Sequence, residues 1–266
     1  MIGPEGLRAI YDAPAGVLAY HGSHGQLVPV AVTPYVLGDE VYVTTTLAYS
    51  RKAGLIRRSP KIALLTGGVY LRADAAVYAD VKGEFFIKHL LEQEMRKYPP
   101  ARTLRRIPFH RRLFGWFFGR AIIKLEPIAV EENAGGDAWT LVTEGENGYP
   151  SIRPIAKADP EGGEVTIPPE LADAPGSAVV FFHSESEDMS ELTSTAFRGE
   201  IKDGAFVAKA RPAGSQVGGA GGQRSRSANA KQAREAMRDW PVLRPCTGRV
   251  SSGGLRLCRR RDARRR

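Results

Sequence analysis

The feature that most constrains this chain is a strand, a short helix and a second strand within residues 40–65. Apolar and polar side chains alternate over residues 41–44, which is the period of a half-buried strand. Ser50 is a good helix N-cap and Pro60 cannot continue a helix, so the sequence predicts a helix over residues 51–58. The apolar run after this proline predicts the second strand.

The turn between the first strand and the helix concentrates hydroxyl groups and cations. Hydroxyls, the free N–H groups of a helix start and two basic side chains together suit a phosphate. The alternative is that the two cations are ordinary solvated charges on a helix face. The candidate cofactor-binding residues are Thr44, Thr45, Thr46, Ser50, Arg51 and Lys52.

A family resemblance rests on the order of these pieces: Thr-Thr, then Ser-Arg-Lys, then Leu-Ile-Arg-Arg-Ser-Pro, between two apolar strands. This order resembles the FMN-binding split β-barrel family, the pyridoxamine-5′-phosphate-oxidase-like proteins. The resemblance covers roughly residues 10–130 and includes the strand pair at 25–34 and the Lys97-Tyr98-Pro99 segment. It implies a mainly β fold with a few helices, a split β-barrel, and a cofactor phosphate held by the side chains of the turn.

The resemblance also implies a function. FMN is the expected cofactor, with the deazaflavin F420 as the alternative and haem as the third choice, since the family includes relatives that bind each. The chain is then a flavin-dependent oxidoreductase acting on an unknown small molecule, or a non-catalytic flavin- or haem-binding protein. No acid or base residue stands out as catalytic, which is consistent with hydride transfer controlled by positioning. Family sites lie between two barrels, so the partner is a second copy in a homodimer or a second copy within this chain.

A similar pattern recurs later in the chain, which predicts a degenerate tandem copy over residues 138–210. Residues 141–150 resemble 18–27, the Glu-Val-Thr-Ile run at 164–167 echoes Glu-Val-Tyr-Val at 40–43, and Arg-Gly-Glu-Ile at 198–201 echoes Lys-Gly-Glu-Phe at 82–85. The second copy has no cation where the first has its Ser-Arg-Lys. Glu170 and Asp173 stand there instead and would repel an anion, so we expect a phosphate site in the first copy alone.

The last part of the chain differs in composition. Residues 213–266 contain 14 Lys and Arg against 3 Asp and Glu, whereas the whole chain has 38 and 29. The preceding residues are therefore close to neutral, and the high isoelectric point says nothing about nucleic-acid binding by them. We expect domains at 1–130 and 138–210, followed by a disordered basic tail at 213–266 outside the fold. This tail has only a weak potential for salt-sensitive nucleic-acid binding.

Composition also bears on whether the protein is disulfide-rich, membrane-spanning, secreted or metal-binding. Both cysteines, Cys246 and Cys258, lie in the basic tail, so there is no disulfide framework in the body and a cytoplasmic location is expected. No apolar run approaches the ~20 residues of a membrane span, and the start of the chain does not read as a signal peptide. No metal site is expected.

The sequence also predicts further strands, a helix and a linker, and it offers further candidate residues near a cofactor. The pattern predicts strands at 17–21, 27–33, 69–81 and 114–125, the last closed by Pro127, a helix at 85–97, and a linker at 131–137. Pro29 marks its strand as an edge or a bulge. The candidates near a cofactor, each also readable as an ordinary loop or core residue, are the arginines of residues 102–112, Trp116, Phe117, Phe118, Arg120 and His183.

Overall fold

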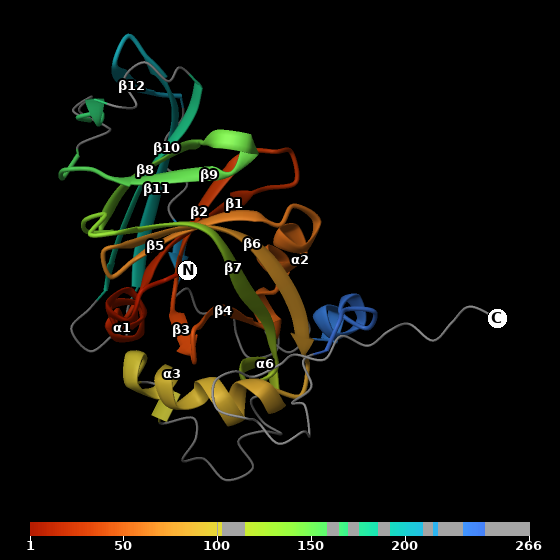
Figure 1. The fold of residues 1–266 in the computed structure, drawn as a ribbon. Helices are drawn as coiled ribbons and strands as arrows, with labels where there is room; N and C mark the ends of the chain where they lie inside the picture. Colours follow the sequence, from red (N-terminus) through yellow and green to blue (C-terminus); the bar gives the residue numbers. More distant parts are fainter. Residues whose placement is uncertain are drawn as a thin grey trace.

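The computed structural model describes residues 1–99, 101–102, 115–158, 165–169, 176–185, 192–209, 215–217 and 231–242. The fold is mainly β, with two antiparallel sheets and a few helices (Figure 1). The first sheet has the strand order β2-β1-β5-β6-β7-β4-β3. Its strands are β1 (Gly16–His21), β2 (Leu27–Val32), β3 (Pro34–Leu37), β4 (Glu40–Thr46), β5 (Lys61–Thr66), β6 (Val69–Asp80) and β7 (Arg120–Glu132).

The second sheet has the order β12-β11-β10-β8-β9, and β13 pairs with β11. The path β9-β8-β10-β11 has the same order as the path β2-β1-β5-β6. The expected second version of β4 at 164–167 is wrong where it can be checked, because residues 165–167 form no strand. The strands are β8 (Trp139–Glu144), β9 (Pro150–Pro154), β10 (Gly176–Glu185), β11 (Leu192–Lys202), β12 (Ala205–Ala208) and β13 (Ser215–Val217).

The helices lie mostly around the first sheet (Figure 1). The helix predicted at 51–58 is confirmed as α2, and the one predicted at 85–97 is the π-helical η2 followed by α3. Asp80 begins η2 by accepting a hydrogen bond from the Phe86 N–H at 2.8 Å. The elements are α1 (Pro4–Asp12), η1 (Leu47–Tyr49), α2 (Arg51–Arg58), η2 (Phe86–Leu90), α3 (Leu91–Lys97), α6 (Gly115–Phe118) and η3 (Glu146–Gly148).

Strand β1 is buried on both faces, which explains its nearly continuous apolar sequence. Leu18 faces the main core inside the first sheet, together with residues of β4, β6 and β7. Val17 and Ala19 face the other way and pack with Ile152 and Phe181 of the second sheet. The two sheets are therefore joined by an apolar layer across β1, β5 and β10.

Strand β7 corrects two of the expected boundaries. The strand expected at 114–125 is wrong at both ends, since α6 precedes β7 and β7 continues through Pro127 to Glu132. The register with β6 shifts between Arg72 and Ala73, so one residue beside the proline is extra. A β-bulge tolerates a proline because the ladder is already interrupted there. Pro29 lies in the edge strand β2, as predicted.

The basic tail contains a segment that belongs to the fold, contrary to expectation. Residues 231–236 are helical, and Ala233 and Met237 are buried in the main core. Their spacing of four places both on one helix face. The Ala79 N–H donates to the Pro241 carbonyl at 2.8 Å. The expected disordered end, both cysteines and residues 218–230 lie outside the described residues.

Among the residues that the structure describes, no helix is both long enough and apolar enough to cross a membrane.

Candidate functional site

The candidate site lies where β4 ends and the chain turns through η1 into α2. Thr44 and Thr45 are buried, Lys52 is half-buried and Arg51 is exposed. Strand alternation separates the threonines, because successive side chains of a strand point to opposite faces. Thr44 and Thr46 share the face of Tyr42, whereas Thr45 points to the other face. The six predicted residues are therefore neighbours in space, but they do not all face one point.

Two of the three threonine hydroxyls already have protein partners. Thr45 donates to the Tyr49 carbonyl at 3.0 Å, which ties the strand end to η1. The Thr44 hydroxyl accepts a hydrogen bond from Arg120 at 3.4 Å. The Thr46 hydroxyl is buried and has no hydrogen-bond partner among the described residues. Because a buried polar group without a partner costs free energy, Thr46 is the hydroxyl best placed to accept or donate to a ligand.

The Lys52 ammonium is likewise a partly buried polar group that no described residue binds. Burial, together with the nearby Arg120 guanidinium, lowers the pKa of Lys52 to about 8. Within the described part of the chain, its ammonium forms neither an ion pair nor a hydrogen bond. Ser50 precedes α2 without using its hydroxyl as a side-chain cap. The turn thus presents a cation and two uncommitted hydroxyls at the first turn of a helix.

Arg120 is the centre of a buried polar network beneath this turn. It lies opposite Thr46 in the β4–β7 register, and one guanidinium nitrogen contacts Glu94 on α3 at 2.9 Å. Tyr35 on β3 donates its hydroxyl hydrogen bond to the other oxygen of Glu94. Burial and the neighbouring Glu94 carboxylate raise the pKa of Tyr35 well above its usual range.

Aromatic rings complete the surroundings of Arg120. Its guanidinium carbon lies 4.0 Å from the ring centroid of Phe86 and 4.6 Å from that of Phe117, within the range of cation–π contact. Sequence reasoning considered Arg120 and missed Glu94 and Tyr35. No local pattern could have identified them, because the network joins four elements: β3, β4, α3 and β7.

The electrostatic balance of the site favours an anion. Glu94 is paired with Arg120, so in the described part of the chain Lys52 has no carboxylate partner of its own, and the Arg120 charge still acts on it. The Nε of Arg120 is also buried without a partner among the described residues. An anionic group would relieve the repulsion between the two cations and satisfy the free donors. The arrangement can therefore hold a phosphate, and the described residues around it offer no general acid or base aligned with a nucleophile.

Several other candidates have structural roles. Phe117 and Phe118 are buried in the apolar cluster under α3. His183 is buried 3.9 Å from Asp137 and lies in the second sheet. Arg102 donates to the Met95 carbonyl at 2.8 Å. Arg105, Arg106, Arg111, Arg112 and the Trp116 side chain lie outside the described residues, as do Glu170 and Asp173.

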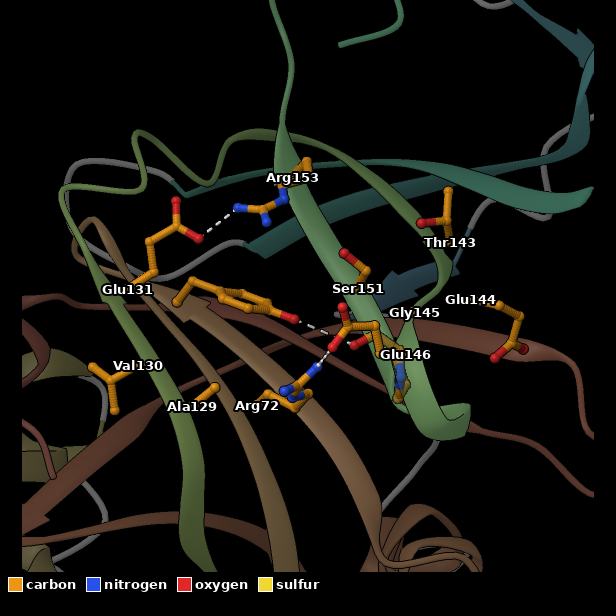
Figure 2. Close-up of a pocket in the computed structure, with 12 residues that line it drawn as sticks. Arg72, Ala129, Val130, Glu131, Thr143, Glu144, Gly145, Glu146, Ser151 and Arg153 are labelled. Atoms are coloured by element: carbon orange, nitrogen blue, oxygen red, sulfur yellow. Dashed lines mark hydrogen bonds and ion pairs between the residues drawn. The ribbon is translucent and has the colours of Figure 1, made fainter. Parts of the chain in front are cut away.

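A groove of about 530 Å³ lies elsewhere, between the two sheets (Figure 2). It is lined from the first sheet by residues near the start of β6 and the end of β7. The candidate phosphate turn lies at the opposite end of these strands, since Asp80 ends β6 opposite Arg120. At ~3.3 Å per residue, the eight residues from Arg72 to Asp80 span roughly 26 Å, so the groove and the turn are separate sites.

No protein-family model and no curated protein matches the sequence. Solved structures that match include a conserved hypothetical protein of Mycobacterium tuberculosis, with 19% identity over 49% of this chain and 82% of that chain at a TM-score of 0.38. An F420 reductase matches with 20% identity over 48% of this chain and 98% of that chain, at a TM-score of 0.33. A haem storage protein of Vibrio cholerae matches with 11% identity over 51% of this chain and 96% of that chain, at a TM-score of 0.36.

Other matches are named as pyridoxamine 5′-phosphate oxidase-related proteins. Structural matches to this kind of split-barrel protein thus cover about half of the chain. The identities are low and the TM-scores lie below 0.5, so these similarities do not assign a cofactor or an activity to this protein.

Proposed function

We propose that this protein binds FMN through the turn between β4 and α2 and is a flavin-dependent oxidoreductase acting on a small molecule. The observation that carries the proposal is that the same turn holds a buried Thr46 hydroxyl and a Lys52 ammonium, neither of which has a partner among the described residues. A phosphate monoester is bound by hydrogen-bond donors and cations, and here the Thr46 hydroxyl would be the donor and the Lys52 ammonium the cation, both partly shielded from water.

The residues fit the cofactor phosphate in this proposal as follows. Lys52 and Arg51 would supply charge, and Thr46 and Ser50 would supply hydroxyls. Thr44 and Thr45 would support the site indirectly, since their hydroxyls are held by Arg120 and by the Tyr49 carbonyl. When bound, the isoalloxazine ring would supply the hydride transfer, and the protein would bind, orient and desolvate it.

F420 is the alternative cofactor because it also carries a phosphate that this turn could hold. The two differ in absorbance, so a spectrum of the purified protein separates them, and a haem spectrum would favour the non-catalytic binding protein instead. Purified protein that is colourless and binds none of the three in titration would contradict the proposal.

We also propose that the second wall of the site comes from another copy of this chain. Tyr49 is exposed directly beside Ser50 at the mouth of the turn. The main contacts of the second sheet are with β1, β2, β5 and β6, away from η1. Flavin binding that stays unchanged in dilutions where the protein is monomeric would rule out this arrangement and favour a site completed within one chain.

The direct test is the replacement of Lys52 by alanine. A charge-assisted hydrogen bond is worth ~1.5–3 kcal/mol, so FMN affinity should fall by ~10- to 100-fold, measured by titration of flavin fluorescence. Arg58→Ala is the matched control, because Arg58 is an exposed cation at the other end of α2. Riboflavin, which lacks the phosphate, should bind weakly and respond little to either change.

The pKa of Lys52 adds a pH test. The ammonium is charged below pH 8 and neutral above it, so FMN affinity should fall as the pH rises from 8 towards 10. Lys52→Arg should remove this fall, because a guanidinium keeps its charge throughout that range. If Lys52→Ala binds FMN like the wild-type protein and shows the same pH profile, the turn is a solvated helix start and the proposal fails.

A further inference from the structure

We propose that the groove between the two sheets is a second ligand site that binds a small organic monocarboxylate. The groove lies between β6 and β7 on one side and β8 and β9 on the other (Figure 2). Its volume of about 530 Å³ is in the range of small-molecule pockets, which often lie where two units of structure meet. This proposal does not depend on flavin binding at the turn before α2.

Two arginines, one from each sheet, face this groove with carboxylate partners that can be exchanged. Arg72 of β6 contacts Glu146 of η3 at 2.9 Å, and Arg153 of β9 contacts Glu131 of β7 at 2.6 Å. Both ion pairs cross from one sheet to the other. The Glu146 side chain is 78% exposed and that of Glu131 is 47% exposed, so water competes strongly for both carboxylates. A ligand carboxylate could therefore replace either one at little cost.

Two further donors at the groove have no partner. The Nε of Arg72 and the hydroxyl of Thr143 are buried and unpaired among the described residues. Thr143 is only 5% exposed, and it lines the groove from β8. A buried donor left unsatisfied costs free energy that a ligand oxygen would recover. A carboxylate oxygen can accept a hydrogen bond from a guanidinium donor or from a hydroxyl, so either group could bind the ligand.

The remaining residues that line the groove indicate which kind of anion it could bind. Tyr70, Ala129 and Val130 form an aromatic and apolar wall, and the Arg153 guanidinium lies 5.4 Å from the Tyr70 ring centroid. Three carboxylates line the groove against two guanidinium groups, and one of the three, Glu144, also contacts His21 at 3.1 Å. This surplus of negative charge disfavours any added anion, and a dianion or phosphate most of all. A single carboxylate on a small apolar or aromatic body fits the wall, and it adds no charge to the ion pair when it takes the place of Glu146 or Glu131 at the arginine.

The experiment is isothermal titration calorimetry of the full chain with three probes of similar size. Benzoate should bind at least ~10-fold more tightly than the neutral benzamide and the dianionic phthalate, a difference of one decade in Kd. Arg153→Met should weaken benzoate by ~10-fold or more, and Thr143→Val by a few-fold. Arg8→Met is the matched control, because Arg8 also pairs with a carboxylate but is exposed on α1.

Folding is kept separate from binding by a second pair of measurements. Thermal melts of each variant identify any loss of sheet packing, and Arg153→Lys retains the charge while losing the planar two-donor geometry. Weaker benzoate binding by a Thr143→Val protein with an unchanged melting temperature supports the site. The proposal is overturned if benzoate and benzamide bind alike, if neither binds up to about 10 mM, which leaves Kd above the range of a specific site, or if all variants bind as the wild type does.

Discussion

The two sheets share the order of four strands and differ in what surrounds their charged residues. In the first sheet, Arg120 and Glu94 form an ion pair that is buried under helices. In the second sheet, Glu200 pairs with Lys202 and Lys209 on the surface. The first sheet has β3, β4 and β7 beyond the shared path, and these are the strands that carry Tyr35, Thr46 and Arg120. The four strands that the two sheets share therefore do not include the strands that build the candidate site.

The difference has an energetic meaning. A buried ion pair is costly to desolvate, and it is retained only where surrounding groups satisfy its hydrogen bonds. Tyr35 and Thr44 satisfy part of this demand for the pair in the first sheet, and the Phe86 ring adds a cation–π contact. The Arg120 Nε, by contrast, has no partner among the described residues. A surface pair makes no such demand on its neighbours. Mutations that remove one charge from each sheet should expose this contrast.

The largest effect is expected from Glu94→Gln. The change leaves the Arg120 charge buried without its counter-ion, which should lower the free energy of unfolding by ~3–5 kcal/mol. Urea denaturation measures this as a lower transition midpoint. Glu200→Gln is the matched control in the second sheet, and its midpoint should stay close to that of the wild type. Equal losses in the two variants would show that burial does not distinguish the sheets.

A smaller loss is expected from the tail segment that packs on the first sheet. Met237 is 2% exposed in the main core, so Met237→Ala should cost ~2–4 kcal/mol in unfolding free energy by leaving a cavity. Arg238→Ala is the control next to it, since Arg238 is exposed. A chain shortened to end at residue 212 should also melt at a lower temperature. An unchanged melting temperature would mean that the tail does not stabilise the first sheet.

The third effect concerns how stability depends on pH, rather than stability at one pH. Lys97 donates to the carbonyls of Ile10 and Pro34, and burial, with a further contribution from Arg96, lowers the pKa of Lys97 to about 7. Between pH 7 and the usual lysine value, the unfolded chain binds a proton that the folded chain has lost. This group therefore makes the protein more stable as the pH rises through that window.

Lys97→Met should remove this contribution, so the wild type should gain stability relative to the variant between pH 7 and pH 10. Thermal melts at closely spaced pH values measure the difference. Lys82→Met is the control because Lys82 is exposed in a turn. Parallel curves for wild type and Lys97→Met would contradict the argument.

The sequence by itself determined several local elements of the first sheet, although it misplaced both ends of β7. Ser50 and Pro60 bound a helix whose observed limits are Arg51–Arg58, and alternation located β4. These signals lie within a few residues of the structures they specify, so a local pattern is sufficient. The sequence also located the candidate turn, whose role as a phosphate site stays a prediction.

The tertiary structure alone decided which groups of that turn are free. Thr45 and Thr46 are neighbours in sequence, yet one hydroxyl is bound to the Tyr49 carbonyl and the other has no partner. The partner of Arg120 is 26 residues away on a helix, and the tail segment reaches the core from more than a hundred residues beyond β4. Contacts of this kind depend on how distant elements pack, and no local pattern of residues encodes them.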